Sequence, residues 1–386
     1  MRLTVPDYYD RFRCIASRCT DNCCIGWEIG IDPAALADYQ FQPGAFGDRL
    51  RAAIQPGDPP YFALTGAGRC PFLNSENLCD IYRHLGETHL CAICDQHPRF
   101  HNWFGAEKES GLGLSCEEAA RLILFSAPPR LTSRQIEEAP DTTGAPDPEL
   151  LAGLRAVRET AFALLREAAL PLAVRLALLA SLTQDLQSWM DGVPEQAEAR
   201  GCTAEQLTAD AAFALAEFYG EQSRWPDLTR QLAEAVPEAS LSEFLAPLLA
   251  LLETLPANHA DWPGRLAELR QALPQRLAHP LWETPELEQA AANVAHYMLY
   301  RYFVSEACEG DALCGAMHAI AAALLLPLLA KQEQGDFQTA LVSAAKAYSR
   351  EVEYAPDNLR AVNEAFWQAD WAAPGLVIGG LLGLHP

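Results

Sequence analysis

Cysteine is the residue type in this sequence whose spacing most clearly indicates chemistry. The stretch RCTDNCCIGWEIGID, residues 18–32, places three cysteines within six positions, and two of them are adjacent. Nine of the twelve cysteines precede residue 117, namely Cys14, Cys19, Cys23, Cys24, Cys70, Cys79, Cys91, Cys94 and Cys116. The first third of the chain therefore concentrates thiols that must either cross-link the chain or bind something.

Disulfide bonds are the weaker explanation for these thiols. Nine is an odd number, and the opening segment MRLTVPDYYDRFRC lacks the continuous apolar stretch of an export signal. A cytoplasm keeps thiols reduced, so disulfides are rare there. We therefore expect a cytoplasmic protein whose cysteines are free to bind a metal.

Metal binding explains the thiols better, because thiolates are soft ligands that suit zinc, Cu(I) and iron–sulfur clusters. The first four cysteines are separated by four, three and no residues, and only CAIC, residues 91–94, has the CxxC spacing that zinc fingers repeat. This staggered spacing favours an iron–sulfur cluster of the 4Fe–4S type, with zinc as the alternative. The number of cysteines exceeds four, so one or two metal sites are possible.

The adjacent pair Cys23 and Cys24 adds a constraint. Neighbouring side chains in an extended backbone point to opposite faces. We therefore expect one of the two sulfurs to ligate the metal, while the other packs or serves a second site.

Other residues of the cysteine-rich part are candidates for contacts around a cofactor. In WEIGID, Trp27, Ile29 and Ile31 alternate as in a short strand that would cover the metal site. In CDQHPRF, His97 could ligate metal and Arg99 could hold a carboxylate. We name Trp27 and Arg99 as the candidate cofactor-binding residues.

Composition excludes some classes of partner. The formal net charge of −23 argues against nucleic acid and against anionic membrane surfaces, since both require a basic face. The stretch ALCGAMHAIAAALLLPLLA, residues 312–330, is long enough to span a bilayer, but its Gly, His and Pro content favours a central helix buried in a helical domain.

The fold class predicted from these patterns is mainly α, with a cysteine-rich, loop-rich metal-binding region at residues 1–126 and an α-helical domain at 149–386. Residues 127–148 contain five prolines and no apolar period, which is typical of a linker. Helix starts are expected at Asp147-Pro148, at the capping box Thr203 to Gln206, and at Thr284-Pro285. We expect Gly192 and Gly220 to end helices.

The order of the motifs resembles that of a known family. The segments CIASRCTDNCCIGWEIGID, GRCPFLNSENLCDIY, CDQHPRF and LSCEEAARLIL are similar to those of the flagellin lysine-N-methylases, which belong to a wider group of cysteine-cluster metal-chelating proteins. In the helical half, NVAHYMLYRYF (293–303) and AYSREVEYAPDNL (347–359) resemble segments of the same family. The resemblance covers most of the chain.

The resemblance implies methylation of lysine side chains on a flagellin-like protein, with S-adenosylmethionine as donor and an iron–sulfur cluster. The matching ligands are Cys14, Cys19, Cys23, Cys24, Cys70, Cys79, Cys94 and Cys116, whereas Cys91 falls outside the pattern. On the aromatic helix, His296, Tyr297 and Tyr300 are candidates for lining the pocket of the substrate lysine. No catalytic base is identified, and no GxGxxG motif of a Rossmann methyltransferase is present.

The same residues allow a second interpretation. Relatives in the wider group are metal binders, so the chain could be a non-enzymatic zinc or iron–sulfur protein whose helical domain docks a partner.

Overall fold

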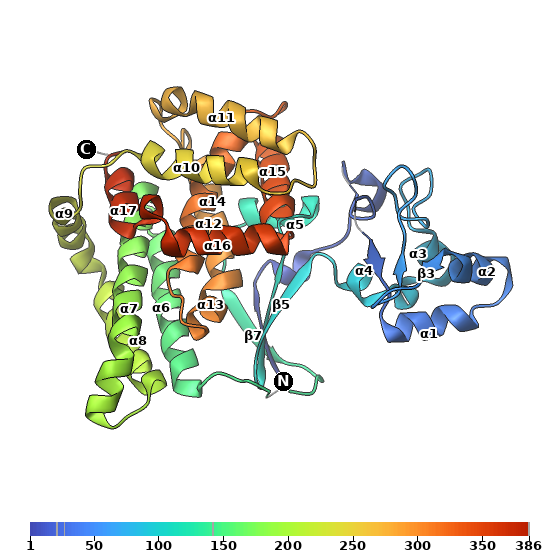
Figure 1. Cartoon of the computed structure of the whole chain (residues 1–386), viewed down its shortest axis with the longest axis horizontal. Coiled ribbons are helices and arrows are strands. Elements are labelled where there is room, and N and C mark those ends of the chain that lie inside the picture. The colour runs from blue at the N-terminus through green and yellow to red at the C-terminus, as the bar shows by residue number, and fades with distance from the viewer. Residues whose placement is uncertain (21, 27, 141–142, 385–386) are drawn as a thin grey trace.

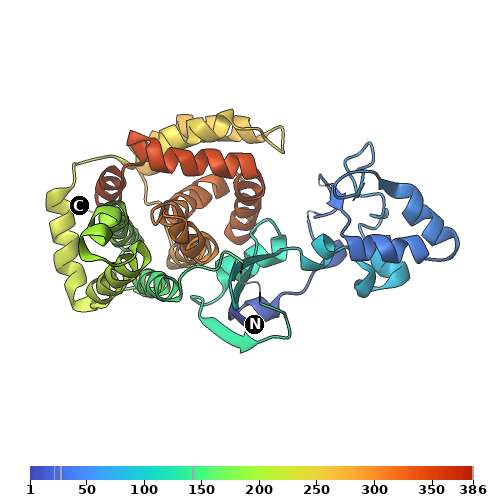
Figure 2. The same ribbon diagram turned by 60° about the horizontal axis from the view of Figure 1, so that its bottom comes forward.

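A computed structural model of the chain describes residues 1–20, 22–26, 28–140 and 143–384. The chain forms two lobes of unequal size that are joined by a narrow connection (Figure 1). The small lobe has a core of its own, built from residues between Cys24 and Cys94, and the large lobe contains both ends of the chain. The same separation is seen after rotation of the molecule (Figure 2).

The small lobe is built from short elements around a core of its own. Its three strands pair in the order β2-β4-β3, and Ile29, Ile31, Tyr39, Phe62 and Phe72 are buried between them and the helices. The strand expected at residues 27–32 is present in part as β2, but Trp27 lies outside the described residues. The elements are β2 (Ile29–Gly30), α1 (Pro33–Phe41), α2 (Gly44–Ala53), β3 (Ile54–Gln55), β4 (Tyr61–Phe62), α3 (Asp80–Leu85) and α4 (Ala92–Gln96).

A four-stranded sheet in the large lobe lies next to the connection. Its strands are β1 (Arg2–Pro6), β5 (Arg99–Phe104), β6 (Glu107–Leu112) and β7 (Leu131–Gln135), in the order β5-β6-β1-β7. The strand β1 runs parallel to β6 and antiparallel to β7. The tight turn between β5 and β6 uses Gly105, which has a positive φ of 65°.

This sheet differs from the loops and the linker that the sequence predicts. Part of the predicted linker, Leu131–Gln135, forms β7, because the backbone of β1 pairs with it over five positions. Residues Tyr8 and Phe12 and the segment 104–124 contribute to the core of the large lobe, so the two cores divide the chain elsewhere than at residue 126. The domain boundaries themselves stay a prediction.

The rest of the large lobe is helical, and the prediction of a mainly α fold is confirmed. One continuous apolar core extends from Tyr8 to Leu381. The helices are α5 (Glu117–Phe125), α6 (Pro148–Arg166), α7 (Leu172–Arg200), α8 (Ala204–Gly220), α9 (Trp225–Ala235), α10 (Leu241–Thr254), α11 (Trp262–Leu277), α12 (Pro285–Met298), α13 (Val304–Cys308), α14 (Cys314–Ala330), α15 (Phe337–Tyr348), α16 (Pro356–Gln368) and α17 (Pro374–Leu382).

Most of the predicted helix boundaries are correct. Asp147 and Thr284 accept hydrogen bonds from the first turns of α6 and α12, and the reciprocal capping box of Thr203 and Gln206 begins α8. Gly220 is the last residue of α8. The stop expected at Gly192 is wrong, because α7 continues to Arg200: an interior glycine costs a helix only about 1 kcal/mol, and packing can offset that.

The apolar stretch at residues 312–330 forms the central helix α14. Every residue from Cys314 to Leu329 is buried, since neighbouring helices surround it. Within the described part of the chain, no helix combines the length and the apolar character that a membrane span requires.

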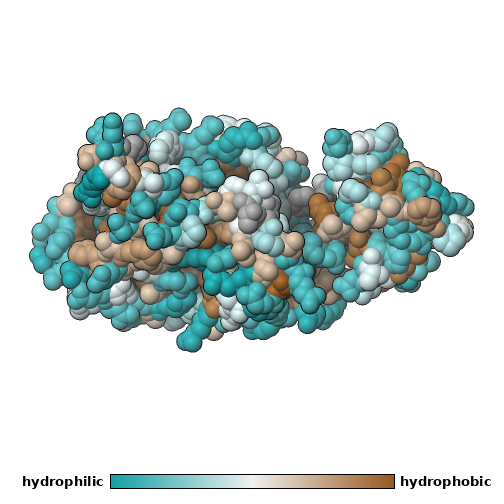
Figure 3. All heavy atoms as spheres, turned by 90° about the horizontal axis from the view of Figure 1, so that it is seen from below, coloured by the Kyte–Doolittle hydropathy of each residue, from teal (hydrophilic) through white to brown (hydrophobic). Residues whose placement is uncertain are grey.

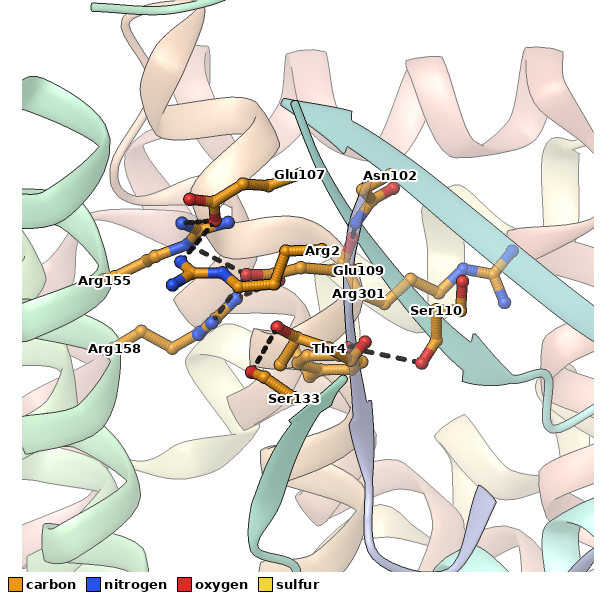
Figure 4. A network of polar contacts seen from close by, with 11 residues as sticks. Arg2, Thr4, Asn102, Glu107, Glu109, Ser110, Ser133, Arg155, Arg158 and Arg301 are labelled. Carbon is orange, nitrogen blue, oxygen red and sulfur yellow. Dashed lines mark hydrogen bonds and ion pairs between the residues drawn. The ribbon is translucent and has the colours of Figure 1, made fainter. Parts of the chain in front are cut away.

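Buried ion pairs fasten the sheet to α6 (Figure 4). Glu109 on β6 accepts hydrogen bonds from both terminal nitrogens of Arg158, at 2.5 and 3.0 Å, and the two side chains are 1% and 2% exposed. Arg155 joins the same Glu109 to Glu107. Burial raises the pKa of Glu109, but the charges of Arg158 and Arg155 outweigh it, so the net pKa is lowered. The sheet is thereby held in a fixed place beside the connection to the small lobe.

Candidate functional site

Five cysteines that are far apart in the sequence belong to the core of the small lobe or pack against it. Two isolated bridges, Ile25 to Arg69 and Leu73 to Cys79, fold the loops back on themselves. The backbone N–H of Cys70 donates to the carbonyl of Cys24 at 2.8 Å. We call the five the small-lobe thiols: Cys24, Cys70, Cys79, Cys91 and Cys94.

Two short helices present three of these thiols. Cys79 precedes α3 and Cys91 precedes α4, each as the residue that flanks the helix start. The N–H of Cys94, in the first turn of α4, donates to the carbonyl of Cys91 at 2.9 Å. The CAIC segment therefore brings both of its sulfurs to one turn of the chain.

The small-lobe thiols carry an electrostatic penalty. Hydrogen bonds, with Cys23 for Cys24 and with Cys91 for Cys94, raise the pKa of both thiols, and burial raises it further. Burial also raises the pKa of Cys70 to about 11. The exception is Cys91, whose pKa is lowered by its hydrogen bond with Cys94. Since nearby sulfurs oppose each other's ionisation, a cation bound among them would relieve this penalty.

A second group of thiols lies where the lobes meet, and we call Cys19, Cys23 and Cys116 the junction thiols. Burial, followed by the charges of Cys19 and Cys23, raises the pKa of Cys116 to about 12. The neighbouring Glu117, in the first turn of α5, accepts hydrogen bonds from the N–H of Thr20 at 2.8 Å and from the thiol of Cys19 at 3.6 Å.

Glu117 also links this loop to the helical body. Its carboxylate lies 3.6 Å from the ammonium of Lys346 on α15, and both side chains are 9% exposed. Burial raises the pKa of Glu117, but the hydrogen bonds from Thr20 and the charge of Lys346 outweigh it, so the carboxylate stays ionised at a lowered pKa. The cysteine loop is thus anchored to α5 and α15.

The donor set suits a metal in chemistry but not in arrangement. Soft thiolates with raised pKa values match zinc or iron. Yet nowhere in the described ranges are three or more His, Cys, Asp or Glu side chains grouped so that they could hold a metal ion. Cys14, a predicted ligand, is exposed, and its sulfur accepts a hydrogen bond from the N–H of Ala16 at 3.4 Å. The iron–sulfur cluster therefore remains a prediction, and binding it would require the cysteine side chains to move.

Cys91, which the family pattern leaves out, lies among the small-lobe thiols. It is buried, and the hydroxyl of Tyr39 lies 3.4 Å from its sulfur. The CxxC spacing of CAIC was the signal in the sequence that could have placed Cys91 among the predicted ligands.

Arg99 and His97, two other residues predicted near a cofactor, lie where α4 ends and β5 begins, at the connection between the lobes. The guanidinium of Arg99 is stacked over the rings of Tyr9 and Phe12, at 5.7 and 5.5 Å. Burial and the charge of Arg350 lower the pKa of His97 to about 4, so its ring is neutral at pH 7. Its buried Nε2 atom has no hydrogen-bond partner in the part of the chain that the structure describes. A role of Arg99 or Trp27 toward a cofactor remains a prediction.

The three candidates for a lysine pocket do not share one environment. His296 is fully buried, and its two ring nitrogens lie 2.8 and 3.2 Å from the carbonyls of Ala292 and Phe162. The hydroxyl of Tyr300 donates to the carbonyl of Thr4 at 2.7 Å and ties the π-helical turn after α12 to the sheet. The hydroxyl of Tyr297, in contrast, donates to a side-chain carboxylate, that of Glu353.

A group of polar side chains is centred on this buried carboxylate, Glu353. Its Oε1 atom accepts hydrogen bonds from the hydroxyls of Tyr297 at 2.8 Å and Tyr302 at 3.0 Å, and it lies 3.3 Å from the guanidinium of Arg301. The guanidinium is in turn stacked against four rings, those of Phe100, Tyr297, Tyr302 and Tyr354. We call these six residues the Glu353 cluster.

Electrostatics keep the tyrosines of this cluster protonated. Burial, the largest cause, raises the pKa of Tyr297 and of Tyr302 well above the ordinary value of 10.0, although Arg301 acts in the opposite direction. Their hydroxyls are therefore hydrogen-bond donors to Glu353 at physiological pH.

Both helices that supply the cluster contain π-helical turns. These are Leu299–Phe303, after α12, and Ser349–Glu353, after α15. π-Helical turns are rare and occur frequently at functional sites, because they shift side chains out of the regular α register. Glu353 was not predicted as a site residue. Its segment resembles the family, but its contacts with Tyr297 and Tyr302 join residues about 50 positions apart, which the sequence does not show.

Comparisons with known proteins support the family resemblance. No family profile and no solved structure matches the chain. Flagellar biosynthetic protein FliU of Salmonella muenchen is 27% identical over 129 residues, which are 32% of this chain and 76% of that protein. Lysine-N-methylase of Salmonella typhimurium strain LT2 and that of Salmonella choleraesuis strain SC-B67 are also 27% identical over 129 residues, 32% of this chain and 32% of each relative.

The resemblance to the flagellin lysine-N-methylases is confirmed over that third of the chain. The matched region spans about a third of the two lysine-N-methylases, so their activity is not carried over as a finding.

Proposed function

We propose that this protein is a lysine N-methyltransferase that takes its methyl group from S-adenosylmethionine and acts on flagellin or a similar surface protein. The similarity to two proteins named lysine-N-methylase, and to a flagellar biosynthetic protein, carries the proposal. It agrees with the cysteine pattern and with the aromatic helix that contains Tyr297.

The reaction is a displacement at the methyl carbon of a sulfonium. The lone pair of a neutral lysine amine forms the N–C bond, while the C–S bond breaks and its electron pair stays on sulfur. Since the free amine has a pKa of ~10.4, the ammonium must lose a proton to solvent or to the enzyme before attack. A water-poor site favours the neutral amine and so lowers that pKa.

The Glu353 cluster offers such surroundings. Tyr297 and Tyr302 are at most 8% exposed, and the rings of Phe100 and Tyr354 complete an aromatic wall. His296 and Tyr300, bonded to backbone carbonyls, would hold α12 in place behind this wall rather than contact the lysine. We therefore centre the proposed substrate site on Tyr297.

The second part of the proposal concerns the cysteines. We propose that the small-lobe and junction thiols hold an iron–sulfur cluster, with zinc as the alternative, and that Cys91 joins the predicted ligands. When bound, the metal supplies positive charge that stabilises the buried thiolates and braces the loops of the small lobe. Reduced thiols and an acidic surface agree with a cytoplasmic enzyme whose partner is a protein and not nucleic acid.

Methyl transfer to flagellin is the direct test. The anaerobically purified full chain is incubated with flagellin and S-adenosylmethionine carrying a labelled methyl group, and label on lysine is located by mass spectrometry. The proposal predicts label with the native chain and none with heat-treated chain. Absence of label from a folded chain with bound metal would contradict it and favour a non-enzymatic metal-binding protein.

A further inference from the structure

Three buried polar atoms next to the Glu353 cluster lack a hydrogen-bond partner in the described part of the chain. They are Oε2 of Glu353 and the hydroxyl oxygens of Ser349 and Ser115. The side chain of Glu353 is 1% exposed, and Ser349 and Ser115 are 0% and 1% exposed. A buried polar group without a partner is costly to folding, so three in one neighbourhood indicate that a polar partner is missing.

The contacts bring together the segments that carry these atoms. Ser349 and Glu353 begin and end the π-helical turn Ser349–Glu353, which closes with a hydrogen bond from the N–H of Tyr354 to the carbonyl of Ser349 at 2.9 Å. Ser115 follows Leu114, whose N–H points to the hydroxyl of Tyr297 at 3.5 Å. Tyr297 itself donates to Glu353.

A glycine makes this approach possible. A Cβ atom on Gly113 would lie 2.1 Å from the hydroxyl oxygen of Tyr354, so only glycine lets the turn before α5 pack this closely. The turn that carries Ser115 and Cys116 is thereby pressed against the π-helical segment that carries Ser349 and Glu353.

We propose that these three oxygens form a binding site for a primary ammonium group. An ammonium has three N–H donors and no acceptor. Its positive charge also complements the negative charge of a buried carboxylate. Arg301 lies against Oε1 of Glu353, whereas Oε2 has no hydrogen-bond partner among the described residues. Aromatic rings beside the carboxylate add favourable contacts with a cation.

One side of the Glu353 cluster extends toward the surface. Arg301 and Phe100 are partly exposed, and Tyr354 is half-buried, so the cluster extends from the core to the surface beside the connection. Seen from below, the surface is notched between the two lobes (Figure 3). Two molecules of the proposed reaction could supply the ammonium group: a substrate lysine, through its side chain, and the methyl donor, through its α-ammonium. In this respect the inference rests on the proposed function.

Equilibrium binding to the full chain separates these sources. One pair of probes is S-adenosylhomocysteine and 5′-methylthioadenosine, which lacks the amino-acid end. The other pair is a flagellin peptide with lysine and the same peptide with norleucine. If the ammonium of either source binds at Glu353, the first member of that pair binds about tenfold or more tightly than the second, since a hydrogen bond to a charged group is at stake.

Variants tie the preference to the three oxygens. Glu353→Gln should abolish the preference, and Ser349→Ala and Ser115→Ala should each reduce it severalfold while the chain stays folded, because they remove hydroxyls that lack partners. The matched control is Glu351→Gln. Glu351 is buried two residues away, but it already accepts hydrogen bonds from the N–H groups of Asn258 and His259, at 2.7 and 3.0 Å.

The outcomes distinguish this inference from the proposed function. Equal binding of both members of both pairs, or a preference that survives both serine variants, overturns the ammonium site even if the chain methylates flagellin. A preference lost in the serine variants supports the site even if no methyl transfer is detected. If Glu353→Gln does not fold, the serine variants decide the matter alone.

Discussion

The small lobe and the large lobe differ in what they bury. Ten described residues form the buried core of the small lobe, and two of them, Cys70 and Cys91, are cysteines. The core of the large lobe is continuous from Tyr8 to Leu381, and its buried charges, such as Glu109 with Arg158 and Glu353 with Arg301, are paired with opposite charges. The thiols of the small lobe, in contrast, lie next to other thiols, which would also become negatively charged on ionisation.

This difference indicates how each lobe is stabilised. A unit of about 60–80 residues buries too little apolar surface to be strongly stable by itself, and such units commonly depend on metals or disulfides. The large lobe exceeds that size severalfold. We therefore expect the large lobe to fold without a cofactor, and the small lobe to depend on the cation that its thiols would bind.

Removal of metal should have the largest effect and should affect one lobe only. With a chelator under reducing, oxygen-free conditions, we expect the small lobe to unfold, because structural zinc sites contribute on the order of 10 kcal/mol to folding. Limited proteolysis followed by mass spectrometry should then show cuts within residues 22–96 and a protected large lobe. If the small lobe resists proteolysis equally well before and after chelation, its folding does not depend on a metal, and the proposed difference between the lobes is wrong.

Breaking a buried ion pair should be the next largest effect, on the other lobe. We expect Glu109→Ala to destabilise the large lobe by about 3–5 kcal/mol, because Arg158 is left buried without its partner. Glu138, whose side chain is 41% exposed and pairs with Lys108, provides the control, and Glu138→Ala should cost less than about 1 kcal/mol. Urea unfolding followed by circular dichroism measures both. A cost below 1 kcal/mol for Glu109→Ala would show that the pair is not what holds the sheet to α6.

Acid should weaken the large lobe through His296. Burial lowers the pKa of this histidine from 6.5 to about 4, so between these values the unfolded chain binds a proton that the folded chain does not. Stability is therefore lost as pH falls from 6.5 toward 4, by roughly 1.4 kcal/mol per pH unit. His296→Gln, which keeps a donor for a backbone carbonyl, should show a shallower loss in urea unfolding at pH 7, 6 and 5. Parallel curves for the two proteins would contradict this assignment.

A helix cap should give the smallest effect. Thr203→Ala removes the side chain that caps α8 and should cost about 1 kcal/mol. Glu217→Ala, at an exposed position on the same helix, is the control and should change the unfolding free energy by less than half of that. A cost shared equally by both variants would mean that the cap contributes nothing of its own.

Local patterns predicted the helices of the large lobe well. The caps at Asp147, Thr203 and Thr284 satisfy the N–H groups of their own first turns, and the stretch at residues 312–330 is apolar on every face, so neighbouring residues determine these features. The four-stranded sheet was not predicted, because β1 finds its partners more than 100 positions later in the chain. Pairing over that distance leaves no mark on a short segment.

The candidate sites show the same limit. The spacing of the cysteines pointed to one region, yet only the fold brings Cys19 to Glu117 and leaves the small-lobe thiols at the core of the small lobe. The aromatic pattern of α12 identified Tyr297 but could not distinguish it from Tyr300 and His296, whose polar atoms meet backbone carbonyls. Glu353 emerges as the central carboxylate only when two π-helical turns from distant segments lie together.

The most direct test of this account is the metal content of the full chain purified without oxygen. Iron, zinc and acid-labile sulfide per chain are measured for the native protein, for Cys24→Ser with Cys94→Ser, and for Cys202→Ser in the large lobe as control. We predict bound metal in the native protein and in the control, and its loss in the double variant. A native protein free of iron and zinc, with amides of the small lobe fully protected from hydrogen exchange, would contradict the claim that the thiols of the small lobe fold around a metal.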